Sequence, residues 1–343
     1  MIKLSICIPT FNRANHLQNC LSSLVQCGIG NNNEIEICVS DNCSTDSTSV
    51  VINQAQNFLR INRNINKSNI GAACNIIEVV KMAKGDFVWI IGDDDLLLPG
   101  ACERIIDLIS KDEKIDYIYV NANHLTTEYI YQYSQPFNLK NLPGDMTLFS
   151  SWKGCGRIEF KKLINPKISF DFLGGIYLSV FRRSLWNANL TCLDPEALLD
   201  KRVFSHFDNT FPHNKIFANA FLNSSAYFIA TPGAVCLTGA REWAPMGPLV
   251  MSVRIPELLE AYRDKGLGFF RYHYCRNAAL SNFFNDFLRL LLYKETTGGK
   301  YVNLPKIILL NSIYPNFYLS ILYPLFRGSF WRKIKNIFIN LFN

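Results

Sequence analysis

The sequence lacks the residue spacings that mark several common classes of protein. Its eleven cysteines include no C-x-x-C pair and no zinc-like spacing, which argues against a zinc ribbon or a thioredoxin-like redox site. Several cysteines fall in apolar runs, so we expect buried free thiols in a reducing compartment. The first apolar segment is followed by neither G-x-G-x-x-G nor G-x-x-x-x-G-K-[ST]. Neither a dinucleotide-binding fingerprint nor a P-loop is therefore expected.

The N-terminus shows no targeting segment, and the chain shows no internal repeat or low-complexity run. The opening "MIKLSICIPTFNR" enters a strand directly, without the long apolar region and cleavage site of a signal peptide. We therefore expect a cytoplasmic protein. With 343 residues, the chain is long enough for one large or two modest domains.

Acidic residues are absent after Glu295, although that stretch carries six basic ones: Lys300, Lys306, Arg327, Arg332, Lys333 and Lys335. The formal net charge of +7 is therefore mainly a property of the tail, because residues 1–295 carry only +1. Such a distribution argues against a general nucleic-acid binder. It indicates a local surface for an anionic partner.

The same tail raises the question of a membrane. Residues 307–326 are uncharged and long enough to cross a bilayer, but Pro315, Pro324 and two asparagines interrupt the segment. The end "FWRKIKNIFINLFN" repeats apolar residues at helical spacing, with basic and polar residues on the other face. We expect an interfacial helix on the inner, cytoplasmic leaflet of the cell membrane. The alternative is a terminal helix packed on its own domain or on a second subunit.

Strand and helix signals alternate along the first hundred residues. Apolar strands are expected at 4–9, 34–40 and 86–91, and helices at about 14–27, after "STDST" and at about 71–83. This alternation predicts a parallel, doubly wound α/β sheet with ligands at the carboxyl ends of its strands. A further helix to about 110 and a strand at 116–123 continue the pattern, and the chain turns helical from about 250. We expect an α/β domain over 1–245, with halves 1–110 and 111–245, and a helical region over 246–343.

The stretch "VWIIGDDDLLLPGA" places Asp93, Asp94 and Asp95 at the end of an apolar strand. Adjacent carboxylates repel one another and resist burial, so the arrangement is costly unless a cation binds there. We expect Mg²⁺ or Mn²⁺, which would bridge the phosphates of a nucleotide diphosphate. The alternative is a solvated turn whose aspartates cap the next helix.

Polar clusters follow three of the predicted strands: "PTFNR" at 9–13, "SDNCSTD" at 40–46 and "GDDD" at 92–95. Their convergence predicts one nucleotide-binding crevice. Asp41 is placed to accept a hydrogen bond from a base N–H, or else to cap the next helix, with Ser44 and Asp46 as rival caps. Three further residues either line the crevice or form a turn and helix start: Asn69, Gly71 and Asn75.

The segments "SICIPTFNR", "CVSDNCSTDST", "SNIGAACN" and "WIIGDDDLLLPGA", in this order and spacing, resemble the family 2 glycosyltransferases of the GT-A fold. The triple-aspartate form is similar to the O-antigen and capsule branch, which includes abequosyltransferase-like enzymes. The resemblance covers roughly the first 110 residues. It implies a GT-A mixed sheet and an inverting transferase that uses a nucleotide-sugar donor and a D-x-D-bound metal. It also implies a saccharide or polyprenyl-diphosphate-linked acceptor in surface polysaccharide synthesis.

By position, the resemblance also implies roles for individual residues. Asp95 is the favoured metal ligand, and Asp93 lies nearer the ribose or sugar or shares the metal. The usual form is D-x-D-D, and Gly92 replaces its first aspartate. The donor nucleotide would meet the remaining members of the set: Pro9, Thr10, Phe11, Arg13, Asp41 and Asp94.

An inverting transfer also needs a general base for the acceptor hydroxyl. The family places an acidic pair at the start of a helix, and "FSHFDNTFPH" offers Asp208, which could equally be a helix cap. The competing carboxylates are Asp171, Asp194, Glu196 and Asp200. Other candidates could contact metal, phosphate or sugar, or could be structural: Gly174, Gly175, His206, His213, Arg241 and Trp243.

Two alternative functions remain open from the sequence. A sugar nucleotidyltransferase also uses a doubly wound sheet, but it needs a basic, glycine-rich loop, and "PTFNRAN" supplies only Arg13. A non-catalytic, membrane-associated protein on a transferase fold would explain Gly92. It would also explain why Phe207 precedes Asp208 where the family has glutamate.

Overall fold

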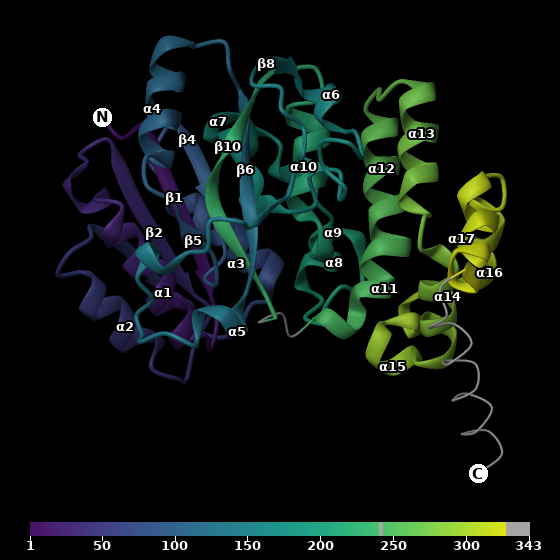
Figure 1. Ribbon diagram of the computed structural model, residues 1–343, viewed down its shortest axis with the longest axis horizontal. Coiled ribbons are helices and arrows are strands. Elements are labelled where there is room, and N and C mark those ends of the chain that lie inside the picture. Colours follow the sequence, from purple (N-terminus) through teal and green to yellow (C-terminus); the bar gives the residue numbers. More distant parts are fainter. Residues whose placement is uncertain (240–242, 327–343) are drawn as a thin grey trace.

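The structure, a computed structural model, describes residues 1–239 and 243–326 (Figure 1). The alternation predicted for the N-terminal part is confirmed. Its apolar helix faces pack on the sheet; in α1, for example, Leu17, Leu21 and Leu24 are buried at helical spacing. The elements are β1 (Leu4–Thr10), α1 (Ala14–Gln26), β2 (Ile35–Asp41), α2 (Thr48–Ala55), α3 (Ala72–Met82), β4 (Phe87–Ile90) and α4 (Ala101–Lys111).

One strand of this part was not predicted. The segment "INRNI" forms β3 (Ile61–Ile65), which pairs only with β2, in parallel. As the outermost strand it is partly exposed, so its sequence has no continuous apolar run. An edge strand of this kind cannot be distinguished from a polar loop by its hydrophobic pattern.

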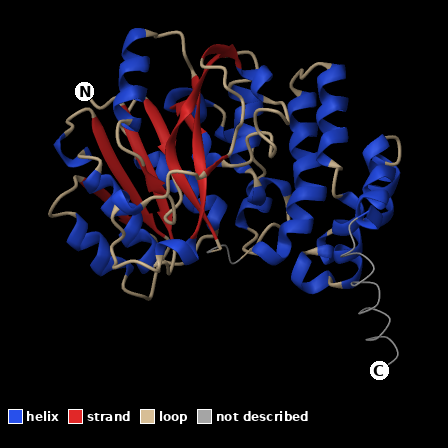
Figure 2. Ribbon diagram, in the orientation of Figure 1, coloured by secondary structure: helices blue, strands red, loops and turns tan. Residues whose placement is uncertain are grey.

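The sheet is mixed, and its strand order is β3-β2-β1-β4-β9-β6-β10-β5 (Figure 2). Within the group β1 to β4, all neighbouring strands are parallel. The next strand, β9 (Ser179–Arg182), lies between β4 and β6 (Tyr117–Thr126) and is antiparallel to both. β10 (Ser225–Thr238) is parallel to β6 and antiparallel to β5 (Leu96–Leu97). Two short strands join the far side: β7 (Thr147–Leu148) and β8 (Gly156–Glu159).

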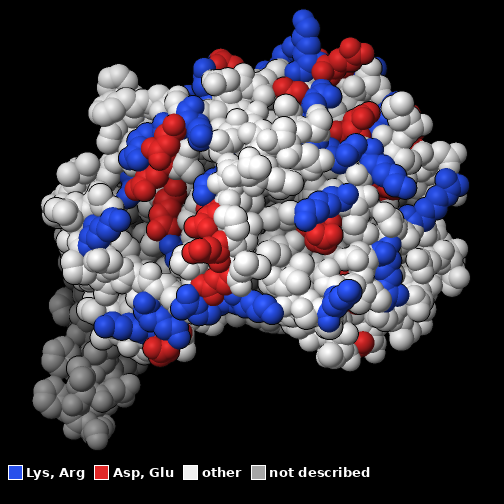
Figure 3. All heavy atoms as spheres, turned by 180° about the vertical axis from the view of Figure 1, so that it is seen from behind, with Lys and Arg blue, Asp and Glu red and all other residues white. Residues whose placement is uncertain are grey.

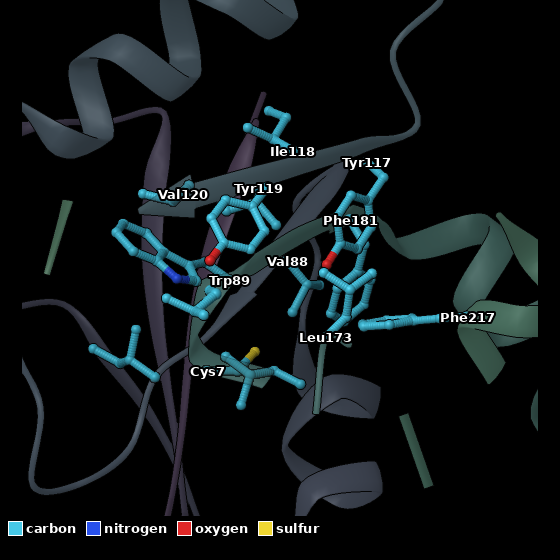
Figure 4. Packing of buried hydrophobic residues seen from close by; sticks show 14 of the residues in the cluster. Cys7, Val88, Trp89, Tyr117, Ile118, Tyr119, Val120, Leu173, Phe181 and Phe217 are labelled. Atoms are coloured by element: carbon cyan, nitrogen blue, oxygen red, sulfur yellow. The ribbon is translucent and has the colours of Figure 1, made fainter. Parts of the chain in front are cut away.

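Aromatic side chains fill the core where the central strands meet the second half of the chain (Figure 4). Phe181 of β9 stacks on Trp186, with ring centroids 4.7 Å apart. Tyr117 of β6 meets Phe217 of α10 (Pro212–Ala220) edge to face at 5.4 Å. Trp89 of β4 donates its indole N–H to the Tyr177 carbonyl at 2.8 Å. The loop around Tyr177 is therefore fixed directly against the central strand.

The region after 245 is helical, as expected. In Figure 1 its helices stand beside the sheet, on the side away from β1 to β3. The longer ones are α12 (Ile255–Asp264), α13 (Phe269–Ala279), α14 (Phe283–Leu292), α16 (Leu304–Asn311) and α17 (Pro315–Phe326). A π-helix at Val250–Arg254 leads into α12. Its shorter helices are α11 (Gly247–Leu249) and α15 (Lys294–Thr297).

Short helices also occur before residue 245: α5 (Thr127–Ile130), α6 (Phe160–Leu163), α7 (Arg183–Ala188), α8 (Pro195–Leu199) and α9 (Phe207–Thr210).

Two expectations about the tail and the cysteines can be compared with this fold. Within 1–239 and 243–326, no helix combines the length and apolar character needed to span a membrane. The uncharged segment instead forms α16 and α17, which are separated by a break before Pro315. The predicted amphipathic helix after 326 lies outside the described residues. All eleven cysteines are free, as predicted, but only six of them are buried: Cys27, Cys43, Cys74 and Cys192 are half-buried, and Cys155 is exposed.

Candidate functional site

The loops that follow β1 and β2 are tied to each other. The Asn12 amide donates to Ser44 Oγ at 2.8 Å. Asp46 accepts from the Ala14 amide at the start of α1 and from the Thr48 amide at the start of α2. Partial burial raises the pKa of Asp46, but these hydrogen bonds outweigh it and lower the pKa overall. Asp46, rather than Asp41, therefore accepts the backbone amides at the starts of α1 and α2, although the N-cap residue of α2 is Ser47.

Asp41, the last residue of β2, is buried with one oxygen engaged and one open. Its Oδ1 accepts the Ser44 amide at 2.9 Å. Its Oδ2 is buried and has no hydrogen-bond partner within the described part of the chain. A buried acceptor without a donor is unfavourable, and such groups are rare. The open oxygen fits the predicted role as an acceptor for a base N–H.

The three residues Asn69, Gly71 and Asn75 form the turn into α3. Asn75 is buried and accepts Ser40 Oγ at 2.7 Å while donating to the Ser40 carbonyl at 3.0 Å. Asn69 accepts the Gly71 amide at 2.9 Å. Gly71 has a φ of 87°, a left-handed conformation that favours glycine. These interactions fit the alternative of a turn and helix start beside the Asp41 loop.

The three aspartates after β4 are held individually. Asp93 accepts Thr10 Oγ1 at 2.7 Å and Arg13 Nη1 at 2.9 Å. Asp94 accepts Arg13 Nη2 at 3.0 Å. Asp95 accepts the Gly92 amide at 2.9 Å, which closes the turn. Asp93 and Asp95 are each only 4% exposed, so this is not a solvated turn.

Gly92 is needed by this turn. A Cβ atom at position 92 would lie 2.7 Å from Asp94 Oδ1 and 2.9 Å from Asp95 Oδ2. Both distances are shorter than van der Waals contact, so any larger residue would displace the carboxylates. The departure from D-x-D-D at this position therefore has a steric reason in this chain.

A cavity of about 420 Å³ opens beside the aspartates. It brings together nine of the residues predicted from sequence: Pro9, Arg13, Asp93, Asp94, Asp95, Asp171, Gly174, Gly175 and Trp243. The other described candidates do not line it: Thr10, Phe11, Asp41, Asn69, Gly71, Asn75, Asp194, Glu196, Asp200, His206, Asp208 and His213. Of these, Thr10 reaches the site through its hydrogen bond to Asp93. Arg241 lies outside the described residues.

Asp171 enters the cavity on a strained turn. It accepts Ser169 Oγ at 2.5 Å and the Gly175 amide at 2.8 Å. The next two residues, Phe172 and Leu173, have φ values of 52° and 73°, which large side chains rarely adopt. Backbone strain of this kind collects at functional sites. Burial raises the pKa of Asp171, and its hydrogen bonds offset this only in part.

Aromatic side chains form much of the remaining wall, and sequence reasoning found only one of them. Phe170, Tyr177, Phe211 and Trp243 all line the cavity. They come from three separate segments of the second half, where no periodic pattern links them. Asp171 and the glycine pair at 174 and 175 were the only signals in "FDFLGGIY", and they point to this wall.

Asp208 occupies a different environment from Asp171. It is buried in the first turn of α9, and its Oδ2 accepts Lys215 Nζ at 2.7 Å and the Asp194 amide at 2.6 Å. The alternative of a helix cap does not apply, because His206 is the N-cap residue. Asp208 therefore carries a charge that is already paired in this structure.

The two histidines also have structural surroundings. His206 lies 3.1 Å from Asp200 at the surface. His213 is buried, and its Nε2 hydrogen-bonds the Gly174 carbonyl at 2.9 Å. Burial lowers the pKa of His213 to about 4, so the ring is neutral at physiological pH. His213 thus supports the turn that carries Asp171.

Whether the aspartate cluster can bind a metal ion depends on how many oxygen ligands it supplies. Within the described residues, no three or more His, Cys, Asp or Glu side chains converge in a way that could hold a metal. Mg²⁺, however, is usually bound by one or two carboxylates together with substrate phosphates. The carboxylates at 93–95 fit such a shared site, in which the nucleotide completes the ligand set.

Residues 5–180, just over half of the chain, match the family model described as glycosyl transferase family 2. The chain belongs to this family. The match includes β1, the Asp41 loop, the aspartate cluster and the turn with Asp171. The fold and the family resemblance inferred from the sequence are thus confirmed. The membership also speaks against the alternative of a nucleotidyltransferase.

Two relatives of known name place the chain within this family. It is 42% identical over 102 residues to the abequosyltransferase RfbV of Salmonella typhimurium, an alignment covering 27% of this chain and 28% of that protein. It is 32% identical over 187 residues to the GalNAc(5)-diNAcBac-PP-undecaprenol beta-1,3-glucosyltransferase of Campylobacter jejuni, covering 54% and 53%. The matches therefore span about half or less of these relatives' length.

Two solved structures share the fold. TarS 1-349 of S. aureus in complex with UDP has a TM-score of 0.55 at 17% identity, over 83% of this chain and 72% of that chain. The mannosyltransferase PcManGT of Pyrobaculum calidifontis, in complex with GDP-Man and Mn²⁺, has a TM-score of 0.51 at 13% identity, over 93% and 83%. At these identities the likeness concerns the GT-A fold alone.

Proposed function

We propose that this protein is an inverting glycosyltransferase that moves one sugar from a nucleotide-diphosphate sugar to a saccharide or polyprenyl-diphosphate-linked acceptor in surface polysaccharide synthesis. One observation carries the proposal. A single cavity joins the aspartates after β4 to the turn with Asp171, in a chain of glycosyl transferase family 2. Asp41, whose buried Oδ2 at the end of β2 has no hydrogen-bond partner among the described residues, would accept a hydrogen bond from the base.

The charge of the cavity supports a requirement for a divalent metal. Among the described lining residues, Arg13 is the only lysine or arginine, against the carboxylates of Asp93, Asp94, Asp95 and Asp171. A diphosphate would be repelled by this excess of negative charge. Mg²⁺ or Mn²⁺ at Asp95 and Asp93 would stabilise the leaving diphosphate. The Mn²⁺ in the similar fold of PcManGT supports this assignment.

One of two buried carboxylates would take the proton of the acceptor hydroxyl. Asp208 is the residue expected from the family resemblance, and it is paired with Lys215. Asp171 lines the cavity, and burial raises its pKa, which is typical of a general base. The aromatic wall formed by Phe170, Tyr177 and Trp243 would then exclude water and contact the acceptor.

A membrane-bound acceptor suits the C-terminal region. The name of the C. jejuni relative specifies an undecaprenol-linked acceptor. In this chain α16 and α17 expose several large apolar side chains, including Leu309 and Leu319, and six basic residues but no acidic ones follow Glu295. We therefore place the protein at the cytoplasmic leaflet as a peripheral protein.

Calorimetry tests this function directly. UDP, GDP, CDP and dTDP would each be titrated into the wild type and Asp95→Asn, with and without Mn²⁺. We expect one nucleotide to bind in a metal-dependent manner to the wild type and at least about tenfold more weakly to the variant, because a ligand carboxylate is lost. If the wild type bound none of the four, the donor assignment would be wrong.

A further inference from the structure

Arg13 occupies an unusual position at the centre of the aspartate cluster. It stands at the N-cap of α1, and its guanidinium spans two adjacent carboxylates, with Nη1 2.9 Å from Asp93 Oδ1 and Nη2 3.0 Å from Asp94 Oδ2. Its side chain is 22% exposed, against 5% for that of Asp93. The Arg13 side chain is thus more exposed than either carboxylate that it contacts.

This position conflicts with the binding of a metal. The guanidinium of Arg13 and a divalent cation bound at Asp93 and Asp95 would share the carboxylate of Asp93, and the two positive charges would repel each other. The pairing of Asp93 and Asp94 with Arg13 agrees with the finding that no described group of acidic residues is arranged to hold a metal alone. A metal that enters must therefore displace Arg13 or bind only weakly.

Arg13 also has a second use. It is the only lysine or arginine among the described residues that line the cavity, and a guanidinium binds phosphate oxygens as readily as carboxylates, in the same two-pronged geometry. When a metal binds the carboxylate of Asp93, a diphosphate beside it would therefore give the Arg13 guanidinium a new anionic partner.

We propose that Arg13 is a resident counter-ion that changes partners: the metal–nucleotide complex displaces its guanidinium from Asp93 and Asp94, and the guanidinium then pairs with the diphosphate of the donor. This inference rests on the proposed function. Its consequence is that metal and nucleotide bind cooperatively. The nucleotide removes the competitor of the metal, and by linkage each strengthens the other's binding.

The test measures Mn²⁺ alone before it measures any nucleotide. The loss of the free Mn²⁺ signal in electron paramagnetic resonance would report metal binding to the wild type, Arg13→Gln and Arg13→Lys. A matched control is Arg60→Gln. Arg60 is an exposed arginine that donates a hydrogen bond to Asn33 and not to any aspartate of the cluster. We expect Arg13→Gln to bind Mn²⁺ about tenfold more tightly than the wild type, because a charge-assisted competitor is removed. Arg13→Lys should lie between the two, and Arg60→Gln should match the wild type.

The second arm measures the nucleotide that binds best, with saturating Mn²⁺. Here Arg13→Gln should bind about tenfold more weakly than the wild type, because the diphosphate loses its guanidinium partner. Opposite signs in the two arms are the signature of a partner exchange. A residue that merely orders the aspartates would weaken both.

Each other outcome is decisive. Unchanged or weaker Mn²⁺ binding in Arg13→Gln would overturn the competition, and unchanged nucleotide binding would overturn the exchange. Melting curves in a chelator guard against misfolding: Arg13→Gln should be less stable than the wild type and should regain more stability with Mn²⁺. If no nucleotide bound to the wild type, the donor assignment would fail, and the Mn²⁺ arm alone would still decide whether Arg13 competes with metal.

Discussion

At the scale of single residues, Asp171 and Asp208 hold their carboxylates in opposite ways. Asp208 is neutralised by Lys215, whereas Asp171 is held by a hydroxyl and an amide, which are neutral donors. A carboxylate that keeps its affinity for protons is better suited to accept one from a sugar hydroxyl. A carboxylate in a tight ion pair must first be released from it.

We predict that one of the variants Asp171→Asn and Asp208→Asn loses about 10²–10⁴-fold in kcat, the usual contribution of a general base. Its nucleotide affinity should stay close to that of the wild type, because the base contacts the acceptor. The other variant should affect mainly the melting temperature. Steady-state kinetics with calorimetry of both variants would check this. Full kcat in both would show that neither residue is the base.

The sequence predicts the acidic members of the site better than their partners. Three adjacent aspartates after an apolar strand are evident from the sequence, because their mutual repulsion requires a cation. That Arg13 provides this charge depends on β1 and β4 being neighbours in the sheet. Arg13 and Asp93 are 80 positions apart in the sequence, so no local pattern connects them.

At the scale of elements, the π-helix Val250–Arg254 joins three parts of the molecule. Val250 and Met251 line the cavity, Arg254 donates to the Ser205 carbonyl just before α9, and Ser252 donates to Asp286 of α14 at 2.8 Å. π-Helical turns are rare and occur frequently at functional sites. This turn links the wall of the cavity to the C-terminal helices.

The ionisation of Asp286 makes the free energy of unfolding depend on pH. Burial raises its pKa from 3.8 to about 6, so between these values the folded protein keeps a proton that the unfolded chain has lost. The folded state then binds more protons, and the free energy of unfolding falls as pH rises from about 4 to about 6, by roughly 3 kcal/mol for this group. Above that range the contribution is constant.

We predict that Asp286→Asn removes this dependence. An asparagine oxygen can still accept the Ser252 hydroxyl, so the fold should be retained. Between pH 4 and pH 7, the unfolding free energy of the variant should rise by about 3 kcal/mol relative to that of the wild type, because only the wild type loses the contribution of Asp286. Urea denaturation across this range would measure it. Asp264→Asn, at a surface ion pair with Arg263, serves as the control and should show no such shift.

At the scale of the whole molecule, the charged and the apolar surfaces are distributed differently. On the face shown in Figure 3, acidic and basic groups are interspersed on a largely uncharged surface. The helices α16 and α17 and the turn between them instead expose several large apolar side chains: Ile308, Leu309, Leu310, Ile313, Tyr318, Leu319 and Leu322. Contiguous exposed apolar surface of this kind marks an interaction site.

We predict that this surface binds anionic bilayers. Leu309→Ser should reduce binding to phosphatidylglycerol-containing vesicles by about tenfold, because one leucine contributes roughly 1.5–3 kcal/mol on burial. Leu199→Ser is a matched control, since Leu199 is 73% exposed and Leu309 is 74% exposed, and it should bind like the wild type. Vesicle sedimentation would compare them. Equal loss in both variants, or no preference for anionic over zwitterionic vesicles, would contradict a membrane role for α16.

The sequence by itself determined the α/β alternation, the family and the cluster at 93–95, because these depend on local periodicity and on residues adjacent in the chain. Only the tertiary structure decided that Arg13 pairs with Asp93 and Asp94 of this cluster, that Asp171 and an aromatic wall line the same cavity, and that Asp208 is paired with Lys215. It also decided that β9 enters the sheet antiparallel between β4 and β6. These features join segments from distant parts of the chain. The packing of the whole core, rather than the pattern of any one segment, brings them together.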